Sequence, residues 1–240
     1  MNHASNHWGI ELNGANEDKN VWRMLLKPPY DPYVEEVPDE RGDYLVPRST
    51  TFDQTTGAKD VHQLARNLFK TLNVVVSKHS DADHVTNGAV IEFVSNGQPR
   101  KHRILEVESG TYRIRGSLAQ LTKNDAQGKI TEPPPAASQA QLWMHAAKLN
   151  PEIGSAIRYL EGKPGWVELY KAWEALEHLP NGGISNSEIK RFKQTANVGE
   201  RHHPDSKIKP HSRPMELWEG RALITQWVSA AINDILAKDP

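Results

Sequence analysis

The sequence predicts an α+β protein, in which an N-terminal antiparallel sheet with one helix is followed by an all-α helical bundle. Short β-rich segments with hairpin turns lie in the first half of the chain, whereas apolar residues at the helical spacings of three and four dominate the second half. A proline-rich stretch separates the halves. We therefore predict an α+β domain over residues 1–122, a linker over 123–137 and a helical bundle over 138–240.

Length and composition restrict the class of protein. The 240 residues suffice for one large domain or two small ones, each with a core. With 29 Lys+Arg against 30 Asp+Glu the net charge is -1, so only a local patch could attract a polyanion. The absence of cysteine excludes disulfides, thiolate metal sites and cysteine nucleophiles. Because the first residues lack a signal-peptide pattern and no apolar run approaches the roughly 20 residues of a membrane span, we expect a soluble cytoplasmic protein.

The predicted N-terminal domain begins with short strands and one helix. Apolar, β-rich residues predict strands over 9–12, 21–26 and 44–46, and prolines and acids predict little regular structure over 27–43. The β-branched residues 73–76 are expected to fray the helix or to start a strand. The helix rests on apolar residues that recur every three or four positions: Val61, Leu64, Ala65, Leu68, Phe69 and Leu72.

An antiparallel meander is predicted over residues 88–116. Residues 89–94 form its first strand, and Asn96-Gly97 favours a tight hairpin because both positions tolerate positive φ. Further strands are predicted on either side of Ser109-Gly110. The resulting sheet carries either a solvated face or a surface for nucleic-acid phosphates. Its cations are Lys101, Arg103, Arg113 and Arg115.

Five amphipathic helices are predicted in the second half. Their apolar positions fall within 142–149, 153–160, 166–179, 189–196 and 214–235. Ser185 and Glu188 match a capping box that opens the fourth of these helices. Tryptophans that recur at helical spacing are predicted to lie in the core: Trp143, Trp166, Trp173, Trp218 and Trp227.

The strongest candidate site is a basic segment between the last two predicted helices, residues 190–213. It contains seven Lys or Arg residues and two acids, a net charge of +5, in a chain that is nearly neutral. This concentration of positive charge suits a phosphate-bearing partner such as RNA, and a solvated loop that balances the acidic residues 35–43 is the alternative. The residues expected to bind nucleic acid are Arg191, Lys193, His203, Lys207, Lys209 and His211.

The same segment offers side chains suited to ribonucleolytic chemistry. A histidine can act as general base for the ribose hydroxyl, and an arginine can stabilise the charge of the phosphorane. We expect Arg201 and His202, or the adjacent His203, to supply these groups, and we predict Asn197 as a further catalytic residue. Zinc is the alternative for a set of possible ligands: His202, His203, Asp205 and His211. Because the surrounding Lys and Arg side chains repel a cation, we predict no metal and no other cofactor.

The order of several segments resembles the C-terminal half of HEPN-family helical domains. The likeness lies in residues 169–176, 189–197, Arg201-His202 and 214–227. Many members of that family are metal-independent ribonucleases of toxin–antitoxin and antiphage systems, and they act as dimers. The family's Arg-x4-6-His motif is not matched, because ten residues separate Arg191 from His202 and nine separate Arg201 from His211.

The resemblance implies a homodimer that binds or cleaves RNA in a bacterial defence or toxin-like setting. The alternative is a non-catalytic adaptor or sensor. In that case the bundle dimerises and the N-terminal sheet binds a partner protein.

Overall fold

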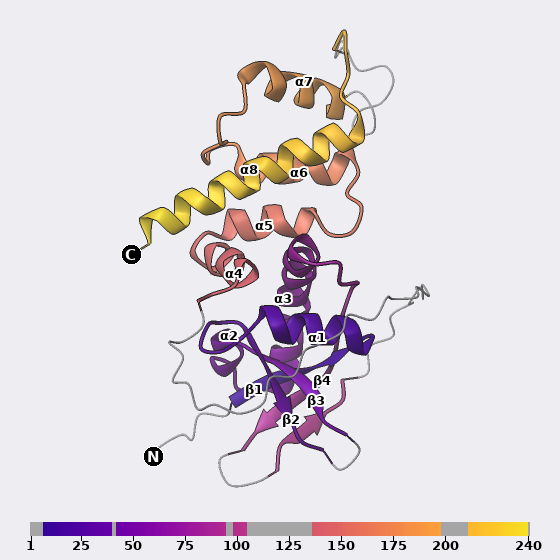
Figure 1. The fold of residues 1–240 in the computed structure, drawn as a ribbon, viewed down its shortest axis with the longest axis vertical. Coiled ribbons are helices and arrows are strands. Elements are labelled where there is room, and N and C mark those ends of the chain that lie inside the picture. Colours follow the sequence, from indigo (N-terminus) through magenta and orange to yellow (C-terminus); the bar gives the residue numbers. More distant parts are fainter. Residues whose placement is uncertain (1–6, 40–41, 95–97, 105–135, 198–210, 240) are drawn as a thin grey trace, which may run out of the picture.

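The computed structural model describes residues 7–39, 42–94, 98–104, 136–197 and 211–239. An antiparallel sheet lies at one end of the molecule, and helices from the second half of the chain lie at the other (Figure 1). The predicted α+β class is confirmed, with an N-terminal sheet and a C-terminal helical region.

The described strands form one antiparallel sheet in the order β2-β3-β1-β4-β5. They are β1 (His7–Asn13), β2 (Tyr33–Val37), β3 (Tyr44–Arg48), β4 (Thr86–Phe93) and β5 (Arg100–His102). The strands predicted over 9–12, 44–46 and 89–94 are confirmed within β1, β3 and β4. A Cβ atom at Gly9 would lie 2.3 Å from Cγ1 of Val46, so only glycine lets the β3 side chain lie across β1.

The predicted strand over residues 21–26 is wrong, because these residues belong to helix α1 (Asn16–Leu25) and its C-cap. Glu17 and Asp18 lie in the first turn of α1, where the helix dipole favours negative charge. Trp22 is fully buried and anchors the helix on the core, with its ring 5.2 Å from that of Phe69.

The expectation of little regular structure over residues 27–43 is also wrong. Residues Tyr33–Val37 form β2, which pairs with β3 along its whole length. Val34 and Val37 are buried, and burial of these side chains stabilises the strand despite the prolines that precede it.

Two helices follow β3: the short α2 (Thr50–Asp53) and α3 (Ala58–His79). The predicted helix is therefore confirmed, and residues 73–76 continue it instead of fraying. The valines of this stretch are buried, which offsets their weak helix propensity. Asn73 donates to the Val85 carbonyl oxygen and accepts from the Val85 N–H, both at 2.9 Å, and so ties α3 to the segment that leads into β4.

The second half of the chain contains the helices that the sequence predicts. They are α4 (Gln139–Leu149), α5 (Pro151–Tyr159), α6 (Trp166–Leu176), α7 (Asn186–Ala196) and α8 (Leu217–Lys238). α8 packs along α4, α5 and α6, whereas α7 lies outermost, at the end of the molecule opposite the sheet (Figure 1).

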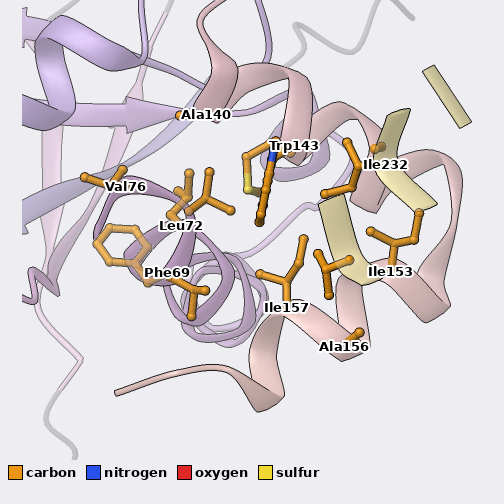
Figure 2. Close-up of a cluster of buried hydrophobic side chains, with 14 of the residues drawn as sticks. Phe69, Leu72, Val76, Ala140, Trp143, Ile153, Ala156, Ile157 and Ile232 are labelled. Atoms are coloured by element: carbon orange, nitrogen blue, oxygen red, sulfur yellow. The ribbon is translucent and has the colours of Figure 1, made fainter. Parts of the chain in front are cut away.

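One buried cluster contains side chains from both halves of the chain. Phe69 and Leu72 of α3, Trp143 of α4 and Ile157 of α5 all belong to this cluster (Figure 2). Most of the predicted linker lies outside the described residues, so the domain division at 123–137 stays a prediction. The described residues show that α3 packs directly against the C-terminal helices.

Candidate functional site

The candidate site at the α7–α8 end is described in part. Its described members include Arg191, Lys193 and Asn197 in and just after α7, and His211 and Arg213 before α8. The remaining predicted residues lie outside the described residues: Arg201, His202, His203, Asp205, Lys207 and Lys209.

The N-terminus of α7 is fixed by the predicted capping box. The Glu188 N–H donates to the Ser185 hydroxyl oxygen at 3.2 Å, and the Glu188 carboxylate accepts from the Ser185 hydroxyl at 2.7 Å and from the Ser185 N–H at 3.2 Å. These donors lower the pKa of Glu188. Phe192, fully buried, anchors the middle of the helix on α6, with its ring 6.0 Å from Trp166 and 6.5 Å from Tyr170.

Arg191 holds α7 against the start of α8. Its guanidinium makes a two-pronged ion pair with the Glu219 carboxylate, at 2.7 and 3.2 Å. It also donates to the carbonyl oxygens of Arg213, at 2.9 Å, and Pro214, at 3.0 Å. The pKa of Glu219 is lowered, first by the Glu216 N–H and then by Arg191. Arg191 thus has a structural role that its sequence context did not reveal.

The outward face of α7 lines an open hollow. Its lining residues are Asn186, Ile189, Lys190, Lys193, Gln194 and Asn197. Lys190 is exposed, and the Lys193 ammonium lies 4.3 Å from the centre of the Trp173 ring. Oδ1 of Asn197 is buried and has no hydrogen-bond partner among the described residues. The hollow combines two positive charges with amide groups, a set of side chains that suits phosphate and base edges.

His211 lies before α8 and contacts the backbone of Arg213. Its Nδ1 lies 3.0 Å from the Arg213 backbone nitrogen and 2.9 Å from the Arg213 carbonyl oxygen. The Arg213 side chain is exposed.

The prediction that all five tryptophans lie in the core is wrong for Trp218, which is 68% exposed. Trp143, Trp173 and Trp227 are buried, as predicted, and Trp166 is partly buried against the core. Trp218 lies about 160° around α8 from Gly220, which faces Trp166, so its ring is directed away from that contact.

The predicted basic sheet surface is engaged in part within the molecule. The Lys101 ammonium lies 3.0 Å from the Asp39 carboxylate, 3.4 Å from that of Glu11 and 3.6 Å from the centre of the Tyr44 ring. Arg103 is exposed. Arg113 and Arg115 lie outside the described residues.

The described part of the chain contains no group of three or more His, Asp or Glu side chains that could hold a metal ion. Of the possible zinc ligands, His211 is described, and its Nδ1 is taken up by Arg213. Among the described helices, none is long and apolar enough to cross a membrane.

Comparisons of the chain with protein-family models, with curated proteins and with solved structures find no match.

Proposed function

We propose that the α7–α8 end of the protein binds RNA. The observation that carries the proposal is the hollow on α7 with Lys190 and Lys193, which belong to the segment 190–213, whose sequence has a net charge of +5. Positive charge concentrated on one part of a nearly neutral protein attracts a polyanion and releases its counterions. The resemblance to HEPN domains supports RNA as the polyanion.

The cations of this end divide into two groups. Arg191 is committed to Glu219 and to two backbone oxygens, so its donors hold the fold. Lys190 and Arg213 are exposed and are the described cations best placed to contact phosphates. In this proposal Arg201 and His202 are the catalytic residues, should the protein cleave the RNA that it binds.

The test measures the affinity for a fluorescent single-stranded RNA by anisotropy over a series of salt concentrations. The double variant Lys190→Gln/Arg213→Gln is expected to bind more weakly, and the slope of log affinity against log salt should fall by about 1.4, or about 0.7 per lost contact. The matched control is Lys70→Gln/Lys78→Gln, which removes two exposed charges from α3.

An unchanged slope in the first variant, or an equal change in the control, would refute the electrostatic contact. A wild-type protein that binds no RNA would refute the proposal itself. Electrophoresis of the same samples reports on cleavage, and cleavage that persists with a chelator supports the metal-independent chemistry expected of Arg201 and His202.

A further inference from the structure

Trp218 is the most exposed of the large hydrophobic side chains that the structure describes. At 68% exposure its ring leaves a large apolar surface in water, whereas Trp227, on the same helix, is 3% exposed. Exposed aromatic rings of this size are frequent at binding sites, because they combine a large contact area with few rotatable bonds.

The position of Trp218 places it beside the candidate site. It occupies the second residue of α8 and directly precedes Glu219, which holds Arg191. Side chains on a helix lean toward its N-terminus, so the ring of Trp218 leans toward the start of α8.

The charge around the ring is positive. The described charged residues in the flanking turns are Arg213, Glu216, Glu219 and Arg221, and Arg191 contributes the charge that pairs with Glu219. Three arginines thus stand against two glutamates. With Arg191 and Glu219 paired, Arg213 and Arg221 stand against Glu216, and this net charge of +1 attracts a polyanion more than a second copy of the same surface. The charge therefore favours a nucleic acid over a second copy of the chain as the partner of the exposed ring.

We propose that Trp218 is a stacking platform for an unpaired base of single-stranded RNA. The inference rests on the proposed function and specifies its substrate class. In a duplex each base is stacked between its neighbours and its flat faces are covered, so the ring can stack only on a base that is unpaired and accessible. Stacking on an aromatic ring tolerates any base, so the site is expected to prefer single strands without a strong sequence preference.

The experiment compares wild type, Trp218→Ala and Trp218→Phe in binding to a labelled single strand of about twelve nucleotides and to the corresponding duplex. We expect Trp218→Ala to bind the single strand about 5- to 100-fold more weakly and the duplex with unchanged affinity. Trp218→Phe should recover most of the loss, because phenylalanine keeps a ring for the base. Met24→Ala, at another exposed apolar position in α1, is the matched control and should bind like wild type.

A strand with the same phosphates but abasic sites separates stacking from charge. Wild type and Trp218→Ala should bind it equally. If wild type binds RNA and Trp218→Ala binds the single strand just as well, the stacking proposal is wrong while the proposed function stands. If wild type binds no RNA, the proposed function is wrong, and the stacking proposal that rests on it is wrong as well. Sedimentation provides a further test, since conversion of a wild-type dimer to a monomer by Trp218→Ala would assign the ring to a second copy and overturn the inference.

Discussion

Replacement of Gln141 by leucine is expected to lower the free energy of unfolding by about 2–5 kcal/mol. The side chain is 2% exposed. Its amide nitrogen donates to the backbone oxygens of Lys27 at 2.7 Å, Pro32 at 3.1 Å and Tyr30 at 3.4 Å. Its amide oxygen accepts from the Ser138 N–H at 3.2 Å. One side chain therefore joins the start of α4 to the segment that precedes β2.

The magnitude follows from what leucine leaves behind. Leucine is of similar size and opens little cavity, but it supplies no donor. A buried acceptor that loses its donor costs about 1–3 kcal/mol, and the bond to Pro32 is buried. The bond to Lys27 is shorter, but it is only partly buried, and water can replace the lost donor there. Its loss therefore costs less, about 0.5–1.5 kcal/mol. Loss of the glutamine half of the capping box adds up to about 1 kcal/mol.

The assay is urea unfolding followed by circular dichroism and by tryptophan fluorescence. Gln63→Leu is the matched control, because Gln63 is exposed on α3, and its effect should stay within about 0.5 kcal/mol. A loss below about 1 kcal/mol for Gln141→Leu, at an unchanged dependence on urea, would refute the reasoning. Water would then satisfy the three oxygens as well as the amide does.

Two further predictions concern buried aromatic contacts. The rings of His79 and Trp143 form a T-shaped pair with their centroids 5.2 Å apart, and Nε2 of His79 is buried without a partner among the described residues. Burial, and secondarily the charge of Lys78, lowers the pKa of His79 from its usual 6.5, so folding favours the neutral ring. Stability should therefore be complete above pH 6.5 and fall as the pH drops from there toward the lowered pKa. His79→Phe should reduce this dependence in urea midpoints measured between about pH 5 and 8, and identical profiles would contradict it. Trp173→Ala should cost about 3–5 kcal/mol in the same assay, because the ring is buried. Trp173→Phe should cost less, since the indole N–H has no acceptor among the described residues, and a loss below about 1 kcal/mol for the alanine variant would place the ring outside the core.

The sequence predicts best those elements whose signal is local. α3 and the C-terminal helices have regular apolar spacing, and their existence follows from it. The strand predicted over residues 21–26 is wrong for a reason that is not local. Val21-Trp22 and Leu25-Leu26 read as an apolar run, but the two pairs also lie one helical turn apart. Residues 21–26 form a helix and not a strand because β1 already pairs with β3 on one side and with β4 on the other, which leaves no edge of β1 for a further strand. Such distant pairings cannot be read from the local pattern.

At the candidate site the total charge could be predicted, but the role of each cation could not. Lys190 and Arg191 are neighbours in the sequence, yet only Arg191 faces Glu219 and the carbonyl oxygens that precede α8. The same holds for Trp218, whose neighbour Leu217 is packed against the core while its own ring is exposed. One position on a helix turns a side chain by about 100°, and packing decides which side becomes interior.

The cations that hold the fold and those that are exposed must be distinguished when substitutions are chosen to identify the RNA contact. Replacing Arg191 removes four hydrogen bonds that join α7 to the start of α8, and a lysine ammonium cannot reproduce the two-pronged pair. α7 would then depend mainly on the packing of Phe192 and the other apolar side chains that face α6. Weaker RNA binding by such a variant would follow from a displaced helix as readily as from a lost phosphate contact. Lys190 lies on the same helix, is exposed and leaves the Arg191 contacts intact when it is replaced, so its effect on the salt dependence reports on the ligand alone.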